Sequence, residues 1–366
     1  MDQYPYESLW INGRELSLRD VIANTANAFT EFEYNTFLFL REWISGTSSF
    51  TLHTSGSTGP PKEIHLRREQ MMASAALTGK VLQLIPGMTA LVCLDTRYIA
   101  GKMMLVRCLH TGMKIVAVDP CANPFQKLPS SLHLDFVALV PYQVTEILES
   151  AEATRLNSVR TIIIGGAVLQ PSAERKLRLF RCQSYITYGM TETISHIALH
   201  KIGDGHNMDF TALPGVKISQ DERGCLVIEA NHLPEKVITN DVVRLVGAQT
   251  FSWLGRWDNV INTGGVKIHS EKIEAQIEKV FTRLNIDIRY LIAGLADPKL
   301  GERVVLILEG DHDPELGEMI KNELKSTLLR FEYPKDVFFI PAFPSTDTGK
   351  IDRPATLRII KTSEIF

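Results

Sequence analysis

The sequence predicts a large α/β domain followed by a small α+β domain. Short apolar runs alternate with stretches of helical period over the first half of the chain. From about residue 220 the runs become shorter and are separated by turn residues, and mixed strand and helix patterns follow residue 255. With 366 residues, the chain is long enough for about two domains of roughly 150 residues.

Four apolar runs in the first half are expected to form buried strands of one sheet. Each is too short for a helix and ends at Pro, Gly or Asp. In the stretches between them apolar residues recur every three to four positions, which favours amphipathic helices. The predicted strands cover residues 90–94, 114–119, 136–140 and 160–164, and helices are predicted at residues 102–111 and 142–151.

The second half is expected to contain a small barrel-like β subdomain and then the C-terminal domain. The subdomain, residues 215–255, would end a large domain of residues 1–255, and residues 256–366 are long enough to fold as the small domain. Predicted strands of the subdomain cover residues 225–229, 242–246 and 250–254. In the small domain, strands are predicted at residues 290–296, 304–309 and 336–340, and helices at residues 271–284 and 314–329.

Composition and charge exclude several classes of protein. The net charge of −3 provides no basic field for nucleic acid, and 45% hydrophobic residues are typical of a globular chain. No apolar run approaches the ~18 residues of a membrane span, and the first residues do not resemble a secretory signal. We therefore expect a cytoplasmic protein without membrane insertion, and we expect its five widely spaced cysteines to be free thiols.

A loop rich in hydroxyls and glycines is a candidate phosphate site. Its backbone N–H groups can approach a polyanion because the glycines lack Cβ atoms. It is not a Walker A loop, because two prolines separate its last glycine from the lysine. A flexible linker is the structural alternative. The candidate phosphate ligands are Thr54, Ser55, Gly56, Ser57, Thr58, Gly59 and Lys62.

Two segments at predicted strand ends are candidates for nucleotide contacts. Residues 165–167 follow a predicted strand, and ligands of open α/β sheets bind just beyond such ends, although a tight turn explains the glycines equally well. In the second segment Tyr188 could cover a base, and Glu192 could hold Mg²⁺ or interact with a helix dipole. Asp241, at the start of a strand, could accept hydrogen bonds from ribose hydroxyls. Lys350 lies on a terminal polar loop, where a lone lysine is usually solvated.

Together with residues 254–268, these segments resemble the adenylate-forming superfamily of acyl-CoA synthetases, peptide-synthetase adenylation domains and luciferases. The similarity begins at about residue 50, and relatives have a longer stretch before the phosphate loop, so we expect a shortened N-terminal region. The resemblance implies that the chain binds ATP and that Arg256 reaches the ribose or a phosphate. Further nucleotide contacts are implied for Gly165, Gly166, Ala167, Thr187, Tyr188, Gly189, Met190, Thr191 and Asp241.

The resemblance also implies a two-step reaction that requires ATP, Mg²⁺ and CoA. A carboxylic acid attacks the α-phosphate to give an acyl-adenylate and pyrophosphate, and the CoA thiol then displaces AMP. Lys350 and Glu192 would be catalytic in the first step, with Glu192 holding Mg²⁺. For the second step, the mobile C-terminal domain would rotate about Asp258 and bring Gly264, Gly265 and Lys267 to the adenylate.

Within the superfamily, residues 188–193 and 258–274 are most similar to o-succinylbenzoate–CoA ligases of menaquinone biosynthesis. The resemblance implies 2-succinylbenzoate as the acid, whose second carboxylate needs a cation or strong donor. Tyr98 stands where such ligases usually have a histidine. The candidate substrate residues are Arg97, Tyr98, Lys102, Arg107 and His196, for which ordinary surface or core positions are the alternative.

Three alternatives remain open from the sequence. The chain could be another aryl- or acyl-CoA ligase, a free-standing adenylation enzyme that loads a carrier protein, or a non-catalytic adenylate-binding protein. The presence of Glu192, Asp241, Arg256 and Lys350 together argues against the last. A homodimer that covers the surface exposed by a short N-terminal region is a further possibility.

Overall fold

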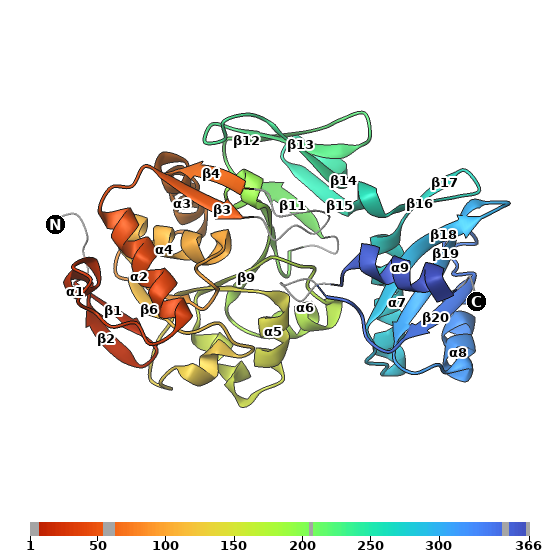
Figure 1. Cartoon of the computed structure of the whole chain (residues 1–366), viewed down its shortest axis with the longest axis horizontal. Coiled ribbons are helices and arrows are strands. Elements are labelled where there is room, and N and C mark those ends of the chain that lie inside the picture. Colours follow the sequence, from red (N-terminus) through yellow and green to blue (C-terminus); the bar gives the residue numbers. More distant parts are fainter. Residues whose placement is uncertain (1–6, 54–62, 205–207, 346–350, 364–366) are drawn as a thin grey trace.

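The computed structural model describes residues 7–53, 63–204, 208–345 and 351–363. Its largest feature is a 13-stranded mixed sheet in the order β12-β13-β14-β15-β11-β10-β9-β8-β7-β5-β6-β1-β2. The C-terminal part of the chain forms a separate five-stranded sheet (Figure 1). The predicted combination of a large α/β unit and a smaller α+β unit is thereby confirmed.

Parallel strands form the middle of the large sheet. The four apolar runs predicted as strands all lie here, with ends displaced by at most two residues. Every residue of β7 and β8 is buried, as expected for strands covered by helices on both faces. The strands are β5 (Thr89–Val92), β6 (Lys114–Ala117), β7 (Phe136–Leu139), β8 (Thr161–Ile164) and β9 (Gln183–Gly189).

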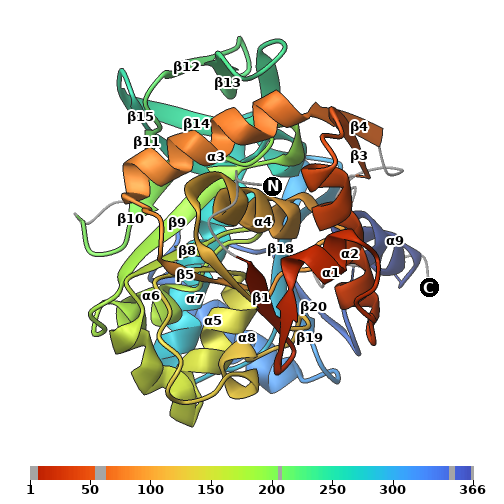
Figure 2. The same ribbon diagram turned by 90° about the vertical axis from the view of Figure 1, so that its left-hand side faces the viewer.

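Helices cover both faces of these strands. Figures 1 and 2 show α3 (Arg68–Leu82) and α4 (Ile99–Thr111) on one side, and α5 (Pro141–Leu148) and α6 (Pro171–Leu177) on the other. The helix predicted at residues 102–111 is α4, and the one predicted at residues 142–151 is α5 followed by a 3-10 segment. This layering leaves the ends of the parallel strands open for a binding site.

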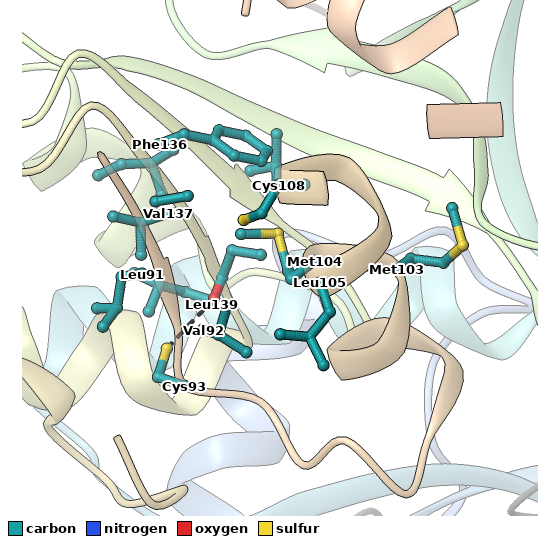
Figure 3. Packing of buried hydrophobic residues seen from close by; sticks show 14 of the residues in the cluster. Leu91, Val92, Cys93, Met103, Met104, Leu105, Cys108, Phe136, Val137 and Leu139 are labelled. Carbon is teal, nitrogen blue, oxygen red and sulfur yellow. Dashed lines mark hydrogen bonds between the residues drawn. The ribbon is translucent and has the colours of Figure 1, made fainter. Parts of the chain in front are cut away.

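The core between α4 and the sheet is rich in sulfur. Figure 3 shows Met104, Leu105 and Cys108 of α4 near Val92 and Leu139 of the strands. All five cysteines are free thiols and four are buried, as predicted. Within the described ranges no group of three or more His, Cys, Asp or Glu side chains could hold a metal ion.

The N-terminal segment extends the edge of the large sheet. Strand β1 (Ser8–Ile11) pairs in parallel with β6, and β2 (Arg14–Ser17) pairs antiparallel with β1. Short helix α1 (Leu18–Ile22) leads to α2 (Glu31–Ile44), whose buried residues include Phe37, Phe39, Leu40 and Trp43. This region, for which the sequence offered no family resemblance, is therefore an integral part of the large core.

Antiparallel strands form the other edge of the large sheet. They include the strands predicted at residues 225–229, 242–246 and 250–254, and they join the parallel part through the β9–β10 pair. The strands are β10 (His196–Lys201), β11 (Asp209–Ala212), β12 (Val216–Gln220), β13 (Cys225–Ala230), β14 (Val237–Gly247) and β15 (Thr250–Arg256).

A separate hairpin flanks the predicted phosphate loop. Strands β3 (Ser49–His53) and β4 (Glu63–Arg67) pair antiparallel, and the register pairs His53 with Glu63. The loop residues themselves, 54–62, lie outside the described part of the chain. The hairpin therefore fixes the two points between which the loop must run.

The C-terminal sheet buries side chains on both faces. One cluster joins it to α7 and α8, and another joins its opposite face to α9. The helix predicted to end at residue 329 ends at Lys325, and Leu329 is 67% exposed, so that leucine does not belong to the buried face. The elements are β16 (Val260–Thr263), β17 (Val266–His269), α7 (Ser270–Leu284), β18 (Tyr290–Asp297), β19 (Gly301–Glu309), α8 (Pro314–Lys325), β20 (Asp336–Ile340) and α9 (Arg353–Ser363).

In the described part of the chain, one short turn connects the two sheets. Strand β15 ends at Arg256, η4 (Trp257–Asn259) forms a single 3-10 turn, and β16 begins at Val260. A long-range rotation would need to change only a few backbone dihedrals at such a connection. Among the described helices, none is both long and apolar enough to cross a membrane.

Candidate functional site

The ends of β8 and β9 place two predicted segments next to each other. Gly165 follows β8, and its N–H donates to the Leu139 carbonyl at 3.1 Å. A Cβ at Gly165 would lie 2.2 Å from Oγ1 of Thr187 on β9, and that hydroxyl donates to the Ile164 carbonyl at 3.1 Å. Gly166 has a φ of +89°, a conformation that favours glycine. The glycines therefore allow close packing of adjacent strand ends beside the candidate nucleotide site.

The neighbouring backbone comes so close to residue 189 that only glycine fits there. A Cβ there would lie 2.4 Å from both the His196 Cα and the Ser195 carbonyl oxygen, which are backbone atoms. We expect Gly189→Ala to lower the free energy of unfolding by about 1–3 kcal/mol, because neither backbone can move freely. Gly247→Ala is the matched control in β14, since nothing lies within 4 Å of its added Cβ. Denaturant unfolding of both variants followed by circular dichroism measures the difference, and equal midpoints would contradict this steric explanation.

Tyr188 and Asp241, 53 residues apart, are joined by a hydrogen bond. The Tyr188 hydroxyl donates to Oδ2 of Asp241 at 2.7 Å, and Nε1 of Trp253 donates to Oδ1 at 3.1 Å. Burial and the negative charge of Asp241 raise the pKa of Tyr188, so its phenol remains a donor. The tyrosine ring also contacts Phe251 edge-on, with ring centroids 5.1 Å apart. The base-stacking and ribose-binding candidates thus form one structural unit.

Arg256 and Asp258 lie beside this unit. Arg256 is the cross-strand partner of Asp241, and its Nη2 donates to Oδ2 of Asp258 at 2.8 Å. Burial opposes the charge of Arg256, but the hydrogen bond to Asp258 and the charge of Asp241 together raise its pKa. Asp258 also accepts from Nδ2 of Asn240 at 3.3 Å. The predicted hinge acid is therefore held by groups of the large sheet.

Glu192 has an environment suited to a solvated cation. It lies in η3 (Thr191–Thr193), is exposed, and has no hydrogen bond or ion pair with any described residue. Met190, which precedes this turn, is half-buried, and its N–H donates to Oγ1 of Thr193 at 2.9 Å. One hard carboxylate fits Mg²⁺ when phosphate oxygens and water complete the coordination sphere.

Arg107 is a buried cation without an acidic partner. Arg107 lies on α4 and is only 2% exposed, and burial lowers the pKa of its guanidinium to about 10. Its Nη2 donates to Oγ of Ser195 at 2.5 Å, whereas Nε has no hydrogen-bond partner. Among the described residues, none forms a salt bridge with it at 4.0 Å or less, so the guanidinium retains capacity for an anion.

His196 supports the same buried cluster. Its Nδ1 lies 3.5 Å from the Ser195 hydroxyl, and its Nε2 lies 3.1 Å from Oγ1 of Thr78 on α3. Burial, aided by the positive charge of Arg107, lowers the pKa of His196 well below its usual range. A neutral imidazole can fix the orientation of the serine hydroxyl that contacts Arg107.

Two of the other predicted substrate residues, Arg97 and Lys102, contact groups of the protein itself. Arg97 forms ion pairs with Asp95 at 2.7 Å and Glu31 at 2.9 Å. Lys102 donates to the Thr96 carbonyl at 2.8 Å and lies over an aromatic ring of α2. It is five residues from Arg107, so the two point about 140° apart around the helix. Tyr98, which precedes α4, is 38% exposed.

The remaining candidates lie on the C-terminal sheet or outside the described residues. Gly264 and Gly265 form the β16–β17 turn with φ values of +59° and +80°. The Lys267 ammonium lies 4.8 Å from the ring centroid of Trp257. Lys350 falls outside the described part of the chain, as do Thr54, Ser55, Gly56, Ser57, Thr58, Gly59 and Lys62.

Sequence reasoning missed Ser195 and Trp253. Ser195 is 88 residues from its Arg107 partner, and Trp253 meets Asp241 only because β14 and β15 pair. Serine and tryptophan at these positions carry no local pattern that signals a role. Both were identified only through tertiary contacts.

Comparisons with known proteins identify the family of the chain. The model of the AMP-binding enzyme family matches residues 42–224, half of the chain. A probable 2-succinylbenzoate–CoA ligase of Mycobacterium tuberculosis is 27% identical over 345 residues, covering 87% of this chain and 86% of the relative. The 2-succinylbenzoate–CoA ligase of Escherichia coli K12 is 28% identical over 329 residues, covering 84% and 68%.

Solved structures give the same assignment. An acyl-CoA synthetase (AMP-forming)/AMP-acid ligase II-like protein from Dyadobacter fermentans is 39% identical, with a TM-score of 0.60, covering 92% of this chain and 97% of that one. The o-succinylbenzoate coenzyme A synthetase of Bacillus subtilis, in complex with ATP and magnesium, is 19% identical with a TM-score of 0.69, covering 83% and 68%, and shares the fold. The chain belongs to the AMP-binding enzyme family.

Proposed function

We propose that the protein is an AMP-forming acid–CoA ligase whose acid is 2-succinylbenzoate. The reaction would use Mg-ATP to make the acyl-adenylate and then CoA to make the thioester, the chemistry implied by the family. The names of the relatives support this choice of acid, and one structural observation carries it. That observation is the buried Arg107 guanidinium, which has no acidic partner among the described residues.

A buried unpaired cation is costly for a folded protein. Isolated charges in an apolar interior are destabilising by several kcal/mol unless a partner compensates them. Here the protein supplies one hydroxyl, from Ser195, and one weakly accepting thioether, from Met104, and leaves Nε without a partner. A ligand carboxylate would provide the missing acceptor through charge-assisted hydrogen bonds. An acid with two carboxylates fits, because one can bind Arg107 while the other reacts.

On the nucleotide side, the proposed contacts use the unit around Asp241. Tyr188 would lie against the adenine, and Asp241 would accept from the ribose while it holds Tyr188 and Trp253. Each carboxylate oxygen has two acceptor sites, so these internal donors leave room for ribose hydroxyls. Glu192 would hold Mg²⁺ together with the ATP phosphates, and Arg256 would lie near the ribose.

We expect Asp241→Asn to weaken AMP binding by about tenfold or more, because a charged acceptor of hydrogen bonds contributes roughly 1.5–3 kcal/mol. Titration calorimetry with AMP measures this loss. Trp253→Phe is the control, since it removes only the indole donor to the same carboxylate. Unchanged AMP affinity in Asp241→Asn would remove Asp241 from the ribose site.

Lys350 is the proposed cation of the first step. It would neutralise charge between the attacking carboxylate and the α-phosphate, where electrostatic stabilisation matters most. The described residues on either side of its segment are held together: Ser345 forms an antiparallel bridge with Ile351, and the Asp352 N–H donates to the Pro344 carbonyl at 2.8 Å. These contacts join the two described ends of the segment that contains Lys350.

The second step would follow a rotation of residues 256–366 relative to residues 1–255. We place the hinge at Asp258, inside the single turn between the two sheets. The rotation would remove Lys350 from the reacting atoms and bring Gly264, Gly265 and Lys267 towards the adenylate. The two half-reactions can then take place at one site in two different geometries.

Product analysis tests the proposal. The protein is incubated with ATP, Mg²⁺, CoA and 2-succinylbenzoate, and the products are identified by mass spectrometry. We expect the CoA thioester together with AMP and pyrophosphate. A thioester formed only with a different acid would replace the substrate, adenylate transfer only to a carrier protein would replace the acceptor, and no ATP-dependent product with any acid would refute the ligase assignment.

A further inference from the structure

The turn that joins the two sheets carries a tryptophan between cations of both units. Trp257 begins this turn, directly after β15 of the large sheet. The Arg223 guanidinium carbon lies 6.0 Å from the Trp257 ring centroid, and the Lys267 ammonium lies 4.8 Å from it. Arg223 belongs to the large unit, between β12 and β13, whereas Lys267 lies on β17 of the C-terminal sheet.

We propose that Trp257 is a positioning residue that favours the present orientation of the two units by contacting Arg223 and Lys267 at the same time. The inference rests on the proposed function, because its consequence concerns the two half-reactions. Cations attract the faces of aromatic rings, with Trp the strongest partner. The contact therefore links the large sheet, the hinge turn and the small sheet.

Arg223 is rigidly fixed to the large unit. It pairs with Asp221 through Nε at 2.9 Å and Nη2 at 2.8 Å. Its Nη1 also donates to Oδ1 of Asn240 at 2.9 Å, and its Nη2 donates to the Thr239 carbonyl at 3.0 Å. The same Asn240 donates to Asp258, so the arginine network reaches the hinge acid.

The Lys267 side chain can separate from Trp257 without breaking a hydrogen bond or ion pair with a described residue. Its side chain is exposed, and within the described ranges it has no hydrogen bond or ion pair, only the contact with Trp257. Figure 1 shows β17 on the side of the C-terminal unit away from β9, so its turn does not face the nucleotide site in this orientation. A rotation about Asp258 that moves β17 away from the large sheet breaks the link that runs from Arg223 through Trp257 to Lys267.

The contact is expected to shift the equilibrium between the two orientations without holding the protein in one of them. An exposed cation–π contact shifts a two-state equilibrium by about 2–5-fold. A contact present in one orientation and absent in the other is a differential interaction, which is what a change in population requires. Loss of Trp257 should therefore favour the orientation used for thioester formation.

Two half-reaction assays on the full-length protein test the inference. We expect Trp257→Ala to lower the rate of pyrophosphate exchange relative to thioester formation from supplied acyl-adenylate by about 2–5-fold. Arg223→Gln should act in the same direction, and Trp257→Phe, which keeps an aromatic ring, should restore much of the ratio. A ratio unchanged in Trp257→Ala, or changed in the opposite direction, would overturn the proposal.

A measurement without catalysis separates this inference from the proposed function. Spin labels at Lys80→Cys on α3 and Glu315→Cys on α8, in a Cys121→Ser background, report the separation of the two units. We expect Trp257→Ala to broaden or shift the distance distribution obtained by pulsed electron resonance, whatever acid the enzyme uses. An identical distribution in both proteins would overturn the proposal, whereas a shift without either half-reaction would refute only the ligase assignment.

Discussion

Lys350→Ala should reduce acyl-adenylate formation by about 10²–10³-fold, the usual effect of removing one group that stabilises transition-state charge. Conversion of a supplied acyl-adenylate to the thioester should stay within a few-fold of the unmodified protein. The reason is that the first step develops charge between a carboxylate and a phosphate, where a cation is required. In the second step the CoA thiol attacks the carbonyl carbon of the acyl-adenylate. The proposed rotation has by then moved Lys350 away from that carbon.

Pyrophosphate exchange measures the first step, and a thioester assay with synthetic acyl-adenylate measures the second. Lys361→Ala is the matched control, because Lys361 is an exposed lysine on α9 of the same unit. It should alter neither rate. Undiminished pyrophosphate exchange in Lys350→Ala would contradict the assignment of this lysine, and equal loss in both assays would contradict the separation of the two steps.

Arg107→Met should weaken substrate binding without lowering the free energy of unfolding. We expect the KM for 2-succinylbenzoate to rise by about 10–100-fold, since charge-assisted hydrogen bonds contribute roughly 1.5–3 kcal/mol. The free energy of unfolding should be unchanged or higher, because replacing a buried charge by an apolar side chain of similar length is often neutral or stabilising. The prediction follows from the absence of an acidic partner among the described residues.

Steady-state kinetics and denaturant unfolding of the same variant provide the two readouts. Arg107→Lys, which keeps the charge but not the planar donor group, should give an intermediate KM. Arg97→Met is the control, because Arg97 is already paired with Asp95 and Glu31 and should leave the KM nearly unchanged. A strong loss of stability in Arg107→Met with a normal KM would make Arg107 a structural residue.

The fold was largely predictable because its buried strands carry strong local signals. β20 forms over the range expected, residues 336–340, and every residue of β7 and β8 is buried. The N-terminal strands were not predicted, because neither is a continuous apolar run: β1 (SLWI) begins with an exposed serine, and β2 (RELS) has no buried residue. The pairing of β1 with β6 joins residues more than 100 positions apart, which no local pattern encodes.

The candidate site was predicted residue by residue but not as an arrangement. Tyr188 and Asp241 were both identified, yet the hydrogen bond between them depends on the paths of β9 and β14. Arg97 and Arg107 look alike in the sequence, since both border or enter the same apolar helix. Only the fold distinguishes them, by placing Asp95 and Glu31 beside the first and no described acid beside the second.

A competition between two acids tests the central claim most directly. Equal concentrations of 2-succinylbenzoate and 4-oxo-4-phenylbutanoate, which lacks the carboxylate on the ring, are offered with ATP, Mg²⁺ and limiting CoA, and the two thioesters are quantified. We predict at least about tenfold preference for 2-succinylbenzoate in the unmodified protein, and loss of most of that preference in Arg107→Met. Equal amounts of both thioesters in the unmodified protein, or the same preference after Arg107→Met, would contradict the proposal that Arg107 recognises a second carboxylate.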